Sequence, residues 1–154
     1  MKSIIALIAV VLLSATLHAD KGAHRFVRKV KFPSELTAIV AEGDFEARSI
    51  GSFTVRLYST PAEKAQPGDD TTFFVGGVIC ERDGSIEEVK LTDIDGNGKP
   101  DLIVTVRNVG TGQYLSAYAF AADTRRVWLR ATVTDLAKDA DPIAALKKAK
   151  RNRK

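Results

Sequence analysis

Hydrophobic and polar residues alternate along much of the chain after its first twenty positions. Phe53, Val55 and Leu57, for example, are each followed by a more polar neighbour, as in a strand with one buried face. Runs of this kind, separated by turn-forming residues at a spacing of roughly 8–12 positions, favour a sandwich or barrel-like sheet. They cover residues 26–32, 36–41, 45–50, 53–58, 73–81, 86–91, 102–107, 114–121 and 127–133. The pattern predicts an all-β, antiparallel, β-sandwich-like single domain.

Three local signals refine this prediction. Asp83-Gly84 lies between two strand-like runs and predicts a hairpin, because glycine accepts the positive φ of such turns. Residues 59–72 contain two prolines and little apolar content, and predict the longest loop. Asp141 and Pro142 suit a helix start, and the apolar edge at 143–146 predicts one short C-terminal helix.

The first nineteen residues have the pattern of a cleaved signal peptide. Lys2 precedes an apolar run at 4–13, and small residues lead to a cleavage position after Ala19. The apolar run is too short to span a bilayer comfortably. We therefore expect an exported protein with a signal peptide at 1–19, one domain at 20–146 and a basic, mobile tail at 147–154, and no membrane attachment after cleavage.

The charge distribution argues against a nucleic-acid-binding protein. The net charge is +4, but six of the 23 basic residues lie in the last eight positions and one lies in the signal peptide. The body keeps 16 basic against 19 acidic residues, so it lacks the basic face that nucleic-acid binding requires. Cys80, the only cysteine, lies in an apolar run, which predicts a buried, unreactive thiol.

An acidic loop, DIDGNGKPD, follows the sixth strand-like run. Asp93, Asp95, Asn97 and Asp101 occupy positions 1, 3, 5 and 9 of a calcium-type loop, and the Lys99 carbonyl occupies position 7. Position 12 is Val104 instead of the expected glutamate, and the flanks resemble strands. Asp, Asn and Gly are also ordinary turn formers. A structural calcium ion and a metal-free acidic turn both remain open, and no cofactor is expected to be required.

A glycine-rich loop follows the next run. Gly110 and Gly112 flank Thr111, whose hydroxyl both donates and accepts hydrogen bonds, and Gln113 and Tyr114 complete the loop. Tyrosine is enriched at interface hot spots, although an ordinary hairpin turn has a similar composition. The mature chain has a single histidine, near its start, and no GxSxG, Walker-type or dinucleotide motif. The protein is therefore not expected to be an enzyme.

These segments together resemble the periplasmic inhibitors of invertebrate-type (i-type) lysozyme. The resemblance rests on FTVRLYS, FFVGGVICERDGSIEEV, LTDIDGNGKPDLIVTVR, GTGQYLSAYAF and KDADPIAAL, within residues 53–146. It implies a periplasmic β-sandwich-like protein whose partner is lysozyme, and some members form homodimers. The family's SGxY-type inhibitory motif, which enters the lysozyme cleft and engages its catalytic carboxylates, would fall on residues 111–114, with threonine in place of serine. Gly110, Thr111, Gly112, Gln113 and Tyr114 are thus the expected inhibitory loop.

Two alternatives belong to other classes of protein. A calcium-dependent exported module for carbohydrate binding or adhesion would use the loop at 93–101, although the chain has only one such unit. A wall-active hydrolase would need catalytic carboxylates that meet only in the folded protein, and no nucleophile or base in the sequence supports it.

Overall fold

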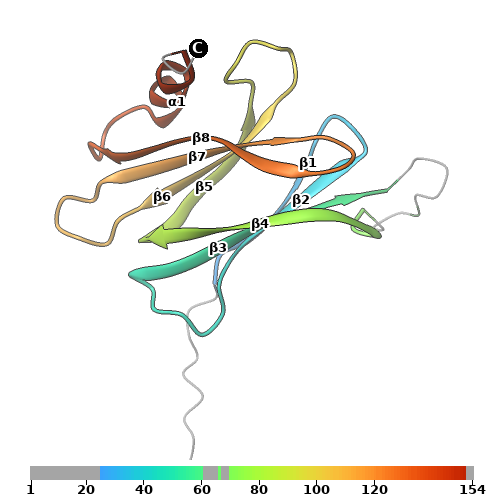
Figure 1. The fold of residues 1–154 in the computed structure, drawn as a ribbon. Helices are drawn as coiled ribbons and strands as arrows, with labels where there is room; N and C mark the ends of the chain where they lie inside the picture. Colours follow the sequence, from blue (N-terminus) through green and yellow to red (C-terminus); the bar gives the residue numbers. More distant parts are fainter. Residues whose placement is uncertain (1–24, 61–65, 67–69, 152–154) are drawn as a thin grey trace, which may run out of the picture.

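Two antiparallel four-stranded sheets pack face to face in the computed structural model, which describes residues 25–60, 66 and 70–151 (Figure 1). The first sheet has the order β1-β2-β3-β4 and the second β5-β6-β7-β8, so each is a simple meander. The strands are β1 Val27–Lys31, β2 Leu36–Glu42, β3 Ile50–Ser59, β4 Phe73–Asp83, β5 Ser85–Thr92, β6 Asp101–Arg107, β7 Leu115–Ala122 and β8 Val127–Leu136. The predicted sandwich is confirmed.

The main core lies between the two sheets. Phe53, Val55 and Leu57 of β3 are fully buried in it, as their alternation predicts. The Phe53 ring contacts Tyr118 and Phe120 of β7 edge to face, with ring centroids 5.1 and 6.1 Å apart. Such aromatic pairs contribute about 0.5–1.5 kcal/mol each beyond their buried area, so Phe53 joins the sheets at their centre.

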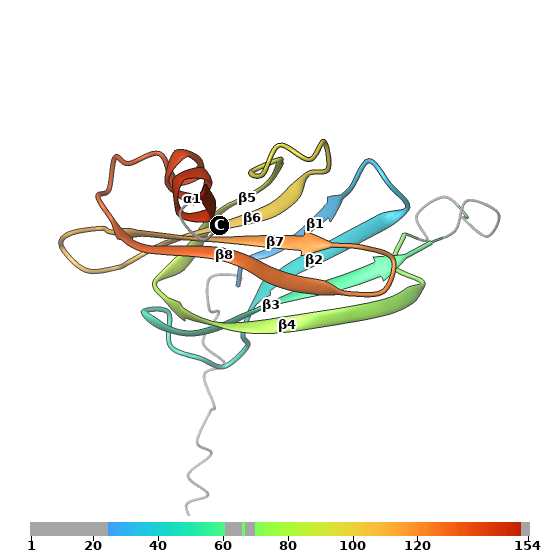
Figure 2. The same cartoon turned by 45° about the horizontal axis from the view of Figure 1, so that its top comes forward.

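The outer face of the second sheet is covered by helix α1, Pro142–Arg151 (Figure 2). Leu146 is fully buried there against a small cluster that includes Ile103 and Ala119. Strands β6 and β7 are consequently buried on both faces, which explains their nearly continuous apolar sequences. The Asp141 carboxylate accepts the N–H groups of Ile143 and Ala144 and caps the helix as predicted. The helix runs to Arg151, further than its apolar edge indicates.

Two sequence predictions are wrong. Residues 45–50 do not form a strand; most of them belong to the loop at 43–49, where Phe45 is fully exposed and has a φ of 61°. The Asp83-Gly84 turn is not a hairpin either, because β4 pairs with β3 while β5 pairs with β6. Gly84 alone separates β4 from β5, and at a φ of 118° it carries the chain from one sheet to the other.

The remaining predictions concern individual segments. Cys80 is partly buried against the main core, and desolvation raises the pKa of its thiol, which agrees with an unreactive role. The predicted signal peptide, most of the 59–72 loop and the end of the basic tail lie outside the described residues. Within the part of the chain that the structure describes, no helix has the length and apolar character needed to cross a membrane.

Candidate functional site: the loop between β6 and β7

The loop at 108–114 projects from one end of the sandwich, between β6 and β7 (Figures 1 and 2). Its base is closed by a hydrogen bond from the Asn108 N–H to the Tyr114 carbonyl at 2.9 Å. A second bond, from the Gln113 N–H to the Gly110 carbonyl at 3.0 Å, closes the turn inside it, where Gln113 has a φ of 47°. The five residues predicted from the sequence, 110–114, therefore form one compact turn.

The two glycines are required by close contacts within this turn. A Cβ on Gly112 would lie 2.4 Å from Cε2 of Tyr114, so the tyrosine ring packs directly over the glycine. A Cβ on Gly110 would lie 2.7 Å from the Asn108 side-chain oxygen, which accepts the Gly110 N–H. The Tyr114 ring is thus held in place by the loop while remaining 52% exposed.

Arg107, at the end of β6, binds the backbone of the loop. Its guanidinium forms a two-pronged ion pair with Glu87, with N–O distances of 2.8 and 3.0 Å, and donates to the Gln113 carbonyl at 3.1 Å. Asn108 donates to the Asp83 carboxylate at 2.7 Å and so attaches the loop to the β4–β5 junction. Arg107 is not among the residues predicted from the sequence, although a basic residue directly before a glycine-rich loop is a usable signal.

The side chains at the tip point to solvent. Thr111 and Gln113 are exposed, as is Val109 beside them. Among the described residues, none forms a hydrogen bond with the Thr111 or Tyr114 hydroxyl. The turn therefore presents two hydroxyl groups, each able to donate and accept, on a fixed backbone.

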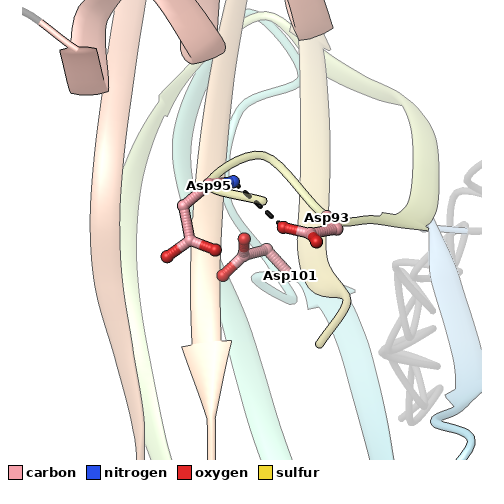
Figure 3. Close-up of side chains that lie close together, drawn as sticks. All are labelled: Asp93, Asp95 and Asp101. Atoms are coloured by element: carbon pink, nitrogen blue, oxygen red, sulfur yellow. Dashed lines mark hydrogen bonds between the residues drawn. The ribbon is translucent and has the colours of Figure 1, made fainter. Parts of the chain in front are cut away.

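The second predicted site, the acidic loop after β5, brings three aspartates together (Figure 3). One oxygen from each of Asp93, Asp95 and Asp101 lies within 4.8 Å of the others. Asp93 accepts N–H groups from residues 95–98, and these bonds, led by that of Gly98, lower the pKa of its carboxyl. Beside the cluster, the Asn97 side-chain oxygen accepts the Lys99 N–H at 2.7 Å.

Arg130 of β8 supplies the positive charge in this cluster. Its guanidinium pairs with Asp95 and lies 3.2 Å from an Asp101 oxygen. The oxygen donors are of the type that calcium prefers, but a guanidinium and backbone N–H groups already engage them. Arg130 therefore balances part of the negative charge of the three carboxylates.

Comparison with known proteins identifies the family of the chain. The sequence profile described as "Periplasmic lysozyme inhibitor of I-type lysozyme" matches residues 24–150. The chain belongs to this family. Its members are periplasmic protein inhibitors and not enzymes. A comparison with curated protein sequences gave no match.

Two solved structures of the family are similar to this chain. The crystal structure of the inhibitor from Aeromonas hydrophila is 40% identical, with a TM-score of 0.72, and the match covers 79% of this chain and 98% of that one. The same inhibitor in complex with Meretrix lusoria lysozyme is also 40% identical, with a TM-score of 0.70 and coverage of 79% and 95%. The family and fold predicted from the sequence are thus confirmed.

Proposed function

We propose that this protein inhibits i-type lysozyme by inserting residues 110–114 into the active-site cleft of the enzyme. The observation that carries the proposal is the rigid tip: Tyr114 packs on Gly112 while Arg107 holds the backbone of Gln113. A loop already in its bound shape loses little conformational freedom on binding. Support also comes from the Aeromonas hydrophila family member, which has been crystallised with a lysozyme.

The chemistry of the target fits the two exposed hydroxyls. A glycosidase of this kind typically places two carboxyl groups around the scissile bond. The hydroxyls of Thr111 and Tyr114 would donate to these groups, and hydrogen bonds to charged partners contribute about 1.5–3 kcal/mol each. The loop would at the same time exclude the sugar and the attacking water. An acidic body would steer a cationic lysozyme toward the complex and increase the association rate.

A cell-lysis assay tests the proposal. Purified mature protein is added to i-type, c-type and g-type lysozymes acting on the same cells, and protection is expected to be strongest against the i-type enzyme. Thr111→Ala and Tyr114→Ala should each weaken inhibition at least tenfold, because each removes a hydroxyl aimed at a carboxylate. Thr111→Ser keeps the hydroxyl and is the matched control. Full inhibition by both alanine variants would show that the loop is not the inhibitory element.

Two further expectations are also tested directly. We propose a homodimer on the family resemblance alone, and sedimentation equilibrium would detect it as twice the mass of the mature chain.

The calcium-dependent binding module is the alternative function, and it requires that chelation abolish ligand binding. The pairing of Arg130 with Asp95 and Asp101 argues against that alternative, because part of the oxygen donor set is already engaged.

A further inference from the structure

The loop at 43–49, between β2 and β3, carries the most exposed large apolar side chain among the described residues. Phe45 is completely exposed, and its φ of 61° lies in the left-handed region that bulky residues rarely adopt. In the isolated protein the exposed phenyl ring buries no apolar surface at this position, and the positive φ is a source of backbone strain. Strain of this kind concentrates at binding sites, where a partner makes use of it.

The loop is held rigidly although Phe45 has no packing partner of its own. The neighbouring Glu46 side chain turns inward, where its carboxylate accepts the N–H and hydroxyl of Ser52. Gly43 and Gly51 leave room for it, since a Cβ on either would lie 2.4 or 2.3 Å from Glu46 atoms. Glu46 therefore anchors the loop, and Phe45 is displayed on a fixed base.

Buried Arg82 of β4 completes this base. Only 1% of the residue is exposed, and its guanidinium donates to the carbonyls of Arg48 at 2.8 Å and Ala47 at 3.1 Å. It also donates to the Gly84 carbonyl, at the junction between the sheets. The Phe45 loop is thus joined to the β4–β5 junction through a buried charge.

The same junction supports the inhibitory loop. The Gly84 N–H donates to the Ser49 carbonyl at 2.8 Å on one side. On the other side, a Cβ on Gly84 would lie 2.0 Å from the Arg107 carbonyl, and Asp83 accepts from Asn108. The 43–49 loop and the 108–114 loop therefore emerge from the same end of the sandwich, as both views show (Figures 1 and 2).

From this arrangement we infer that Phe45 is a second contact with the lysozyme whose cleft receives residues 110–114. The inference rests on the proposed function. A specific interface buries about 800 Å² on each partner and uses roughly 20–30 residues. A five-residue loop alone does not supply that many residues. Aromatic side chains are enriched in the centre of such interfaces. The Phe45 ring would rest on an apolar patch of the lysozyme beside the cleft.

Substitutions that suit a positive φ test the inference without unfolding the loop. Phe45→Gly and Phe45→Asn both accept this backbone conformation, so the melting temperature should stay the same or rise. The inhibition constant against the i-type lysozyme should rise at least tenfold. Phe45→Trp, which keeps an aromatic ring, should retain most of the inhibition.

Phe74→Ala is the matched control. Phe74 is 63% exposed and lies at the far end of β4 from Asp83, about 30 Å away at 3.3 Å per residue; its substitution should leave inhibition unchanged. Inhibition by Phe45→Gly equal to wild type, alongside a loss in Tyr114→Ala, would overturn the inference and leave the proposed function intact. An equal loss in Phe74→Ala would also overturn it. Failure of the wild-type protein to inhibit would remove both.

Discussion

The contact between Gly112 and Tyr114 shows how one missing methyl group shapes the loop at 108–114. Gly112 does not have a φ in the left-handed region that favours glycine. The need for glycine comes from the tyrosine ring, which occupies the space where a Cβ would be. The sequence alone suggests backbone freedom as the reason for this glycine, whereas the structure indicates side-chain packing.

Gly112→Ala should therefore displace the Tyr114 ring while the fold stays intact. We expect inhibition of i-type lysozyme to weaken about tenfold or more, equivalent to about 1.4 kcal/mol. The free energy of unfolding should change by less than about 1 kcal/mol, since the turn is exposed. Gly76→Ala is the control, because no atom lies within 4 Å of a Cβ placed there. Unchanged inhibition by Gly112→Ala would mean that the ring position does not matter.

At the scale of elements, the acidic loop and strand β8 form one electrostatic unit. The loop sequence predicts clustered carboxylates correctly, but its counter-ion, Arg130, lies 29 positions after Asp101. No local spacing rule connects the two residues, because strand β7 and two turns separate them along the chain. The calcium prediction considered only oxygen donors near one another in sequence and therefore left out the arginine.

Arg130→Met should reveal the repulsion among these carboxylates. We expect the free energy of unfolding to fall by about 2–3 kcal/mol, below the 3–5 kcal/mol typical of a fully buried pair, because these side chains are 3–18% exposed. Millimolar calcium should then raise the melting temperature of the variant and leave the wild type unchanged. Arg56→Met removes an exposed charge and serves as the control. A wild-type protein destabilised by chelators would contradict this account.

At the scale of the whole molecule, the sequence predicts those features that are set by residues close to one another along the chain. The alternation at Phe53, Val55 and Leu57 locates the core, and the glycine-rich turn locates the exposed loop between β6 and β7. Two errors have a common physical cause: the Phe45 segment and the Asp83-Gly84 turn are joined through Arg82, whose carbonyl partners Ala47 and Arg48 lie more than thirty positions before it. Pairing across such distances leaves no periodic pattern in the sequence.

Both loops, at 43–49 and 108–114, lie at the end of the sandwich that Arg82 holds together. Besides its carbonyl partners, it lies 3.9 Å from Glu42, whose carboxylate accepts the Ile86 N–H of β5 at 2.7 Å. This pair therefore connects the first sheet to the second. Removing one member of a buried pair leaves the other without its counter-charge, at a typical cost of 3–5 kcal/mol.

Arg82→Met keeps an apolar side chain of similar length and removes the charge. We expect the free energy of unfolding in urea to fall by about 3–5 kcal/mol, and inhibition by the fraction that remains folded to weaken because the Phe45 loop loses its base. Glu42→Gln in the same chain should recover part of the loss, since the isolated carboxylate is then neutral, and a double-mutant cycle measures this coupling. A loss below about 1 kcal/mol, or strictly additive effects, would show that the two sheets are held together by other contacts.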